Sequence, residues 1–172
     1  MKFTGRMWIF PDKNINTDQI FPGKYTYDPL TPEQMAEHAL EDYLPSFAKE
    51  VQKGDILITG QNFGSGSSRE QAVTCLKAAG VAAIVGVSFA RIFYRNAINN
   101  AFPLIPCPEA AQYIFEHADV LKDEKITVNL IDGTIAIKDK TFNFPPLTGE
   151  ALNIFKAGGL LEYTKKKLAQ KK

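Results

Sequence analysis

The chain has 172 residues, of which 45% are apolar and 23% are charged, and its formal net charge is +1. This length fits one domain, which buries roughly 70% of the surface that the unfolded chain exposes. The near-neutral charge argues against nucleic-acid or acidic-membrane binding, and no apolar run approaches the ~20 residues of a membrane span. We therefore expect a single domain over residues 1–172.

The cysteines and the N-terminus indicate the compartment. Cys75 and Cys107 are far apart in the sequence and form no CxxC pair, so neither a disulfide framework nor a metal or cluster site is expected in this chain. The first six residues lack the apolar core and cleavage site of a signal peptide. We expect an unprocessed cytoplasmic protein that binds no metal itself.

Strand and helix patterns alternate along most of the chain, which predicts an α/β layered domain. Strands are expected at four apolar runs, residues 7–10, 55–60, 81–87 and 102–106. Helices are expected at four segments with helical apolar spacing, from Thr31 through Leu40, from near Ser67 to Gly80, and over residues 89–100 and 108–118. Residues 55–60 are apolar enough to be buried on both faces as an inner strand.

The pattern becomes antiparallel near the C-terminus. Asp132-Gly133 separates two alternating runs, residues 125–131 and 134–137, which is a strong hairpin signal, and residues 141–144 add a third strand. Residues 147–157 are expected as a final helix that ends at two glycines. The lysine-rich residues 164–172 are expected as a solvated tail, which is more often solubilising than a nucleic-acid patch.

Residues 14–23 allow two interpretations. Their Asn and Asp side chains suit a turn in which they bond to their own backbone. Alternatively, Thr17 and Asp18 are active-site groups on a rigid loop. The two histidines, His38 and His117, have no second histidine at ligand spacing, so we expect both at the surface rather than on a metal.

Residues 62–72, a glycine- and serine-rich run between a strand and a helix, carry the most chemical information. No lysine follows the glycines as in a P-loop, and Arg69 stands where a dinucleotide fingerprint needs its third glycine. The spacing also fails the G-x-S-x-G pattern of a nucleophile elbow. What remains is a loop whose glycines, Gly64 and Gly66, permit close backbone approach at a helix N-terminus.

Such a helix start favours an anion, and the planar fork of Arg69 matches a carboxylate. The competing interpretation is purely structural. Ser67 and Glu70 have the S-x-x-E spacing of a capping box, in which Ser67 only caps the helix.

Three motifs together resemble the aconitase superfamily: residues 16–20, 64–70 and 93–100. Their order and spacing are similar to those in the small subunits of isopropylmalate isomerases and homoaconitases. The resemblance implies the swivelling β/β/α domain of that superfamily, a layered sheet with flanking helices and a C-terminal β-hairpin. The resemblance also implies a large partner subunit that holds a [4Fe-4S] cluster. This sequence agrees, since its two distant cysteines cannot supply the cluster ligands.

The resemblance implies a role for each motif residue. Ser67 would be the general base, stabilised by helix N-terminal amides and Arg69. Ser68 and Arg69 would hold a substrate carboxylate, while Thr17 and Asp18 would line the site. Gly64 and Gly66 would support the loop without contacting substrate. Arg95 and Asn96 would either do the same or simply anchor their helix. Ser65 and Gln71 replace residues common in the family without removing a base or a carboxylate partner.

In archaeal members of the family, substrate choice is read from a loop that aligns with residues 25–28, where homoaconitases resemble Tyr-Leu-Arg-Thr. Tyr27 occupies the arginine position, and its ring can pack on an isopropyl group but cannot neutralise a carboxylate. The expected hydro-lyase reaction is therefore the isomerisation of 2-isopropylmalate to 3-isopropylmalate in leucine biosynthesis. Homoaconitate or another hydroxy diacid such as a dimethylmalate is an alternative substrate, since Lys24 is close by, and a non-catalytic anion-binding assembly module is an alternative class.

Overall fold

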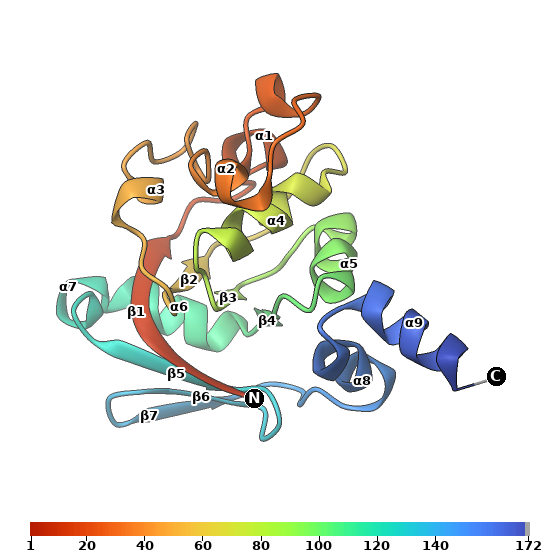
Figure 1. The fold of residues 1–172 in the computed structure, drawn as a ribbon. Helices are drawn as coiled ribbons and strands as arrows, with labels where there is room; N and C mark the ends of the chain where they lie inside the picture. The colour runs from red at the N-terminus through yellow and green to blue at the C-terminus, as the bar shows by residue number, and fades with distance from the viewer. Residues whose placement is uncertain (171–172) are drawn as a thin grey trace.

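The structure is a computed structural model that describes residues 1–170. Within these residues one sheet runs through the molecule in the order β4-β3-β2-β1-β5-β6-β7 (Figure 1). Its strands in chain order are β1 (Lys2–Phe10), β2 (Ile56–Thr59), β3 (Ala83–Gly86), β4 (Leu104–Pro106), β5 (Lys125–Asn129), β6 (Thr134–Ile137) and β7 (Lys140–Asn143). The four strands expected from apolar runs and the antiparallel C-terminal strands are all confirmed.

Strand β1 joins two kinds of sheet. Its second half pairs in parallel with β2, from Met7 opposite Ile56 to Phe10 opposite Thr59. Its first half pairs antiparallel with β5. The strands β1 to β4 therefore form a parallel half, and β5 to β7 extend β1 as an antiparallel half. The α/β fold class with flanking helices and a C-terminal hairpin is confirmed.

Helices cover both faces of the sheet. In chain order they are α1 (Thr17–Ile20), the 3-10 turn η1 (Gly23–Tyr25), α2 (Pro32–Ala36), α3 (Phe47–Glu50), α4 (Glu70–Ala78), α5 (Arg91–Asn99), α6 (Pro108–Glu116), α7 (Ala118–Leu121), α8 (Gly149–Ala157) and α9 (Leu160–Ala169). Figure 1 shows α8 and α9 side by side near α5, with which both are in contact.

Alternation along the inner strands creates two cores. Leu57 and Ile84 face a cluster that includes side chains of α4 and α5, whereas Ile56 and Val85 face the opposite cluster with α6. All four side chains are fully buried, and each such burial contributes about 1.5–3 kcal/mol relative to exposure. Because β2 and β3 are buried on both faces, they form a rigid base for the loops that follow them.

The helix expected through Leu40 ends earlier, at Ala36. Leu40 adopts a left-handed backbone with φ of 56° and its N–H donates to the Ile20 carbonyl at 2.8 Å, so the chain turns here to place this side chain in the core. His38 lies only partly at the surface, since its ring stacks on Tyr25 and its side chain is 25% exposed. His117 is exposed as expected.

The C-terminal lysines are more ordered than expected. Much of the expected solvated tail, residues 164–169, belongs to the exposed helix α9, where Lys165 pairs with Glu162 and Lys167 with Glu150. Helical i,i+3 pairing of opposite charges supports such a helix even without a buried face. The last two residues of the expected tail lie outside the described residues.

A buried carboxylate fixes the β1–β2 junction. The Asp55 side chain is 3% exposed and accepts hydrogen bonds from Arg6, Trp8 Nε1 and the Gln52 N–H at distances of 2.6–3.0 Å. Burial raises the pKa of Asp55, but the hydrogen bonds from Arg6, Gln52 and Trp8 outweigh burial and leave it below the usual value. The ionised form is therefore the one that stabilises the fold.

Replacing Asp55 with Asn tests this junction. A lowered folded-state pKa supplies stability that is present above the unfolded-state pKa and lost as pH falls through the folded-state value. We expect Asp55→Asn to lower the free energy of unfolding at neutral pH by about 1–3 kcal/mol, and this difference to shrink below about pH 4. Urea denaturation across pH measures it, and a difference independent of pH would contradict the assigned charge state.

Candidate active site

The candidate site lies where the parallel strands end. Strands β1, β2 and β3 run in the same direction, so the loops after them meet at one edge of the sheet. Two isolated parallel bridges tie these loops together, Asn16 to Ser65 and Phe63 to Phe89. The carboxyl edge of a parallel sheet is where such folds usually bind ligands.

A cavity of about 490 Å³ opens at this edge. It brings together seven of the residues predicted from the sequence: Thr17, Gly64, Gly66, Ser67, Ser68, Arg69 and Arg95. The remaining lining comes from the beginning of α5, namely Ala90, Arg91, Ile92 and Phe93. A smaller cavity of about 340 Å³ is lined mainly by apolar side chains of α5, β4 and α8. Only the larger of the two gathers hydroxyl and guanidinium groups, so we place the candidate site there.

The glycines allow the loop to pass close to its neighbours. Gly64 has a left-handed φ of 81°, donates its N–H to the Ile15 carbonyl at 2.8 Å, and lies so close to Phe93 that a Cβ would be 2.2 Å from the ring. Gly66 has a φ of 94°, and a Cβ there would be 3.4 Å from the Thr17 hydroxyl. The predicted requirement for glycine thus has a steric basis at Gly64 and a backbone basis at both positions.

The capping interpretation of Ser67 is wrong. Helix α4 begins at Glu70, its N-cap is Arg69, and no side chain caps it. The Arg69 backbone is extended, with φ of −131° and ψ of 114°, so the helix does not start before Glu70, and the Ser67 carbonyl accepts from the Thr17 hydroxyl at 2.8 Å. Glu70 accepts instead from the Asn100 side-chain amide at 3.1 Å. Ser67 and Ser68 therefore stay in the loop, exposed at the cavity.

Both interpretations of the first loop hold in part. Asn16 caps α1 through a capping box with Gln19, with hydrogen bonds of 2.9 and 3.0 Å, as the turn interpretation expects. The next residue, Thr17, lines the cavity, and its N–H also donates to the Ser65 carbonyl at 2.8 Å. Local capping thus orients α1 so that its first turn contacts the glycine-serine loop.

Arg69 is held in place before any ligand arrives. Its Nη1 forms an ion pair with Asp18 and donates to the Phe21 carbonyl at 3.3 Å. The Arg69 side chain is 17% exposed and that of Asp18 is 58% exposed. Among the described residues both contacts use Nη1, so Nε and Nη2 remain as donors for a carboxylate. Asp18 contacts Arg69 but does not line the cavity, where the sequence had placed it.

Besides Asp18, two further predicted residues lie outside the cavity lining. Tyr27 is 96% exposed and does not line it, so its contact with substrate remains a prediction. Asn96 lies on α5, where its carbonyl accepts from the Asn100 amide at 2.8 Å, which suits a structural role. Sequence reasoning missed Arg91. The signal that singled out Arg69, a cation at the start of a helix after a buried parallel strand, applies equally to Arg91.

The cysteines do not fit a cluster site. Cys75 is buried and its thiol lies 3.6 Å from the Ile20 carbonyl, whereas Cys107 belongs to the core on the other side of the sheet. Burial raises the pKa of both thiols, which disfavours the thiolate that binds iron. Residues 1–170 contain no group of three or more His, Cys, Asp or Glu able to hold a metal ion. Over the same residues no helix is long and apolar enough to cross a membrane.

These features define an α/β domain with an anion-binding cavity at the carboxyl edge of its parallel strands. A family model described as the aconitase C-terminal domain matches residues 9–108, which include every residue of the cavity lining. The relatives cover the full chain. The 3-isopropylmalate dehydratase small subunit of Aquifex aeolicus is 47% identical over 99% of both chains, and that of Heliobacterium modesticaldum is 43% identical over 100% of both.

A crystal structure of 3-isopropylmalate dehydratase from Methanocaldococcus jannaschii superposes with a TM-score of 0.84 at 39% identity, covering 99% of this chain and 98% of the other. The chain therefore belongs to the aconitase C-terminal domain family and, within it, to the 3-isopropylmalate dehydratase small subunits. The resemblance drawn from the three motifs is confirmed.

The close approach of Gly64 to Phe93 is testable with a matched glycine. We expect Gly64→Ala to lower the free energy of unfolding by at least about 2 kcal/mol more than Gly158→Ala. Gly158 also has a left-handed φ, of 92°, but nothing lies within 4 Å of an added Cβ. Both variants lose the same backbone freedom, so the difference measures the collision. Equal losses in urea denaturation would show that Phe93 does not restrict the loop.

Proposed function

We propose that this chain is the small subunit of a heteromeric hydro-lyase that converts 2-isopropylmalate to 3-isopropylmalate in leucine biosynthesis. Its full-length similarity to small subunits of that name supports this function. The observation that carries the chemistry is the Ser67 hydroxyl in a cavity shared with Arg69. The proposal places the complex in the cytoplasm, where its two free thiols stay reduced.

The proposed reaction begins with proton abstraction. Ser67 Oγ takes the proton from one substrate carbon as the hydroxyl leaves the neighbouring carbon. When water adds back, the hydroxyl goes to the first carbon and Ser67 returns the proton to the second. A serine hydroxyl is a weak acid, so its oxyanion needs stabilisation. The positive end of α4, which begins three residues later, and the Arg69 guanidinium supply it.

The arginines give the cavity its charge. Arg69 is proposed to bind one substrate carboxylate through Nε and Nη2, with Ser68 donating a further hydrogen bond. Asp18 keeps the guanidinium in position through its ion pair. Arg91 and Arg95 line the same cavity and are exposed, which suits a substrate with two carboxylates. Because the backbone at Gly64 and Gly66 holds the serines, both glycines are proposed as supports of the loop.

The site is incomplete in this chain alone. Its cysteines do not fit cluster ligation, so the proposal assigns the [4Fe-4S] cluster to the large subunit, where its Lewis acidity would assist departure of the substrate hydroxyl. Tyr27 is exposed at the end of the substrate loop, where a substrate held by the large subunit would meet it. Its ring suits the isopropyl group, and Lys24 nearby is what favours homoaconitate as the alternative substrate.

The reconstituted complex tests the function. With the large subunit present, we expect a higher kcat/KM for isopropylmalate than for homoaconitate, and no turnover by the small subunit alone. Ser67→Ala should lower kcat by roughly 10²–10⁴-fold, because it removes the base, while assembly with the large subunit is retained.

Ser65→Ala is the matched control. It removes a hydroxyl from the same loop that points to the Asn14 carbonyl at 3.4 Å and does not line the cavity, so it should change kcat far less. Full activity of Ser67→Ala would refute the base assignment. Assembly without turnover in the wild-type complex would favour the anion-binding assembly module instead.

A further inference from the structure

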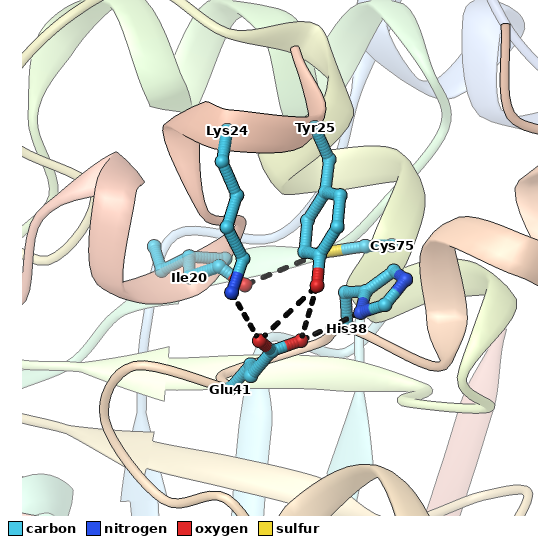
Figure 2. Close-up of polar contacts among 6 residues, drawn as sticks. All are labelled: Ile20, Lys24, Tyr25, His38, Glu41 and Cys75. Atoms are coloured by element: carbon cyan, nitrogen blue, oxygen red, sulfur yellow. Dashed lines mark hydrogen bonds and ion pairs between the residues drawn. The ribbon is translucent and has the colours of Figure 1, made fainter. Parts of the chain in front are cut away.

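Four side chains form a polar cluster beneath the loop that precedes Tyr27 (Figure 2). Glu41 accepts hydrogen bonds on Oε1 from Lys24 Nζ at 2.9 Å and from the Tyr25 hydroxyl at 3.3 Å. Its Oε2 lies 2.6 Å from His38 Nδ1. We call Lys24, Tyr25, His38 and Glu41 the Glu41 cluster. None of these side chains lines the cavity that holds Ser67.

The Glu41 cluster is partly shielded from solvent except at Lys24, whose side chain is 60% exposed. The Glu41 side chain is 29% exposed, and the Tyr25 ring stacks on His38 with centroids 3.8 Å apart. Burial raises the pKa of Glu41, but hydrogen bonds from Lys24 and His38 outweigh burial and leave it below the usual value. Glu41 is therefore a carboxylate at neutral pH, and its contact with Lys24 is a charge-assisted pair.

The cluster is joined to the carboxylate-binding end of the cavity through one short segment. A Cβ on Gly23 would lie 2.9 Å from Asp18 Oδ1 and 3.2 Å from Arg69 Nη2, so Gly23 packs directly on that ion pair. The Thr26 carbonyl accepts from the Gln71 side chain of α4 at 3.4 Å. Lys24 thus follows directly after Gly23, the residue that packs on Arg69, yet the Lys24 ammonium points to Glu41 (Figure 2).

We propose that Glu41 is a specificity-determining residue, because it holds the Lys24 ammonium in an ion pair and so denies it to an additional substrate carboxylate. This inference rests on the proposed function and deepens it. A lysine without its carboxylate partner, next in the chain to Gly23, would attract a substrate with a third carboxylate through long-range charge. With the Lys24 charge paired to Glu41, the substrate loop presents the Tyr27 ring beside a compensated ion pair, which favours an apolar substituent over a charged one.

The test uses the complex with the large subunit and two substrates, isopropylmalate and homoaconitate. Glu41→Gln keeps the side-chain shape but removes the charge that holds Lys24. We expect the ratio of kcat/KM for homoaconitate to that for isopropylmalate to rise by about tenfold or more. Adding Lys24→Met in the same chain should return the ratio to the wild-type value, which a merely structural role of Glu41 would not do.

Two single variants complete the test. Lys24→Met alone should not raise the ratio, since it frees no cation and leaves the Glu41 carboxylate without its lysine partner. Glu33→Gln, which removes an exposed carboxylate from the first turn of α2, should leave it unchanged and controls for net charge.

An unchanged ratio in Glu41→Gln with assembly and isopropylmalate turnover intact overturns the inference, as does a raised ratio in Lys24→Met alone. If Glu41→Gln does not assemble, the Lys24→Met result still decides. If the wild-type complex converts neither substrate, the proposed function itself is wrong and the inference falls with it.

Discussion

The hydrogen bond from the Thr17 hydroxyl to the Ser67 carbonyl determines how the rest of the site is arranged. The Arg69 backbone is extended, so α4 starts at Glu70, and the two serines remain in an exposed loop that this bond ties to α1. The same contact fixes the first turn of α1 against the loop, which brings Asp18 to Arg69. This bond between segments fifty residues apart helps bring Ser67, the proposed base, and Arg69, the proposed carboxylate-binding residue, into one cavity.

The sheet makes this contact possible. Strands β1 and β2 are parallel neighbours, so the loops that follow them emerge at the same edge, and the next loop along joins them through the Phe63 to Phe89 bridge. Rigid strands buried on both faces hold these loops in register, and Gly64 lets the chain pass within contact of Phe93. The proposed functional side chains therefore lie mainly on loops, while the buried strands beneath hold those loops in fixed positions.

Most of the fold could be predicted from the sequence because it depends on local patterns, such as the apolar run of β2 and the Asp-Gly hairpin between β5 and β6. The failures have long-range causes. The Ser67 carbonyl accepts from the Thr17 hydroxyl fifty residues away, and Ser67 does not cap α4. Helix α2 ends at Ala36, and the chain then turns so that the Leu40 N–H donates to the Ile20 carbonyl. The motifs found seven cavity residues but missed Arg91, and they could not show that Lys24 is bound by Glu41, since spacing says nothing of side-chain partners.

The central claim is that the Thr17 hydroxyl presents Ser67 for catalysis, and kcat of the Thr17→Val complex tests it most directly. Valine keeps the buried shape of Thr17, which is 2% exposed, but removes the donor to Ser67. We expect an assembled complex whose kcat falls by about tenfold or more, because the loop loses its fixed geometry. Thr74→Val, which loses only a hydrogen bond within α4, should keep wild-type kcat. Wild-type kcat in Thr17→Val would contradict the claim.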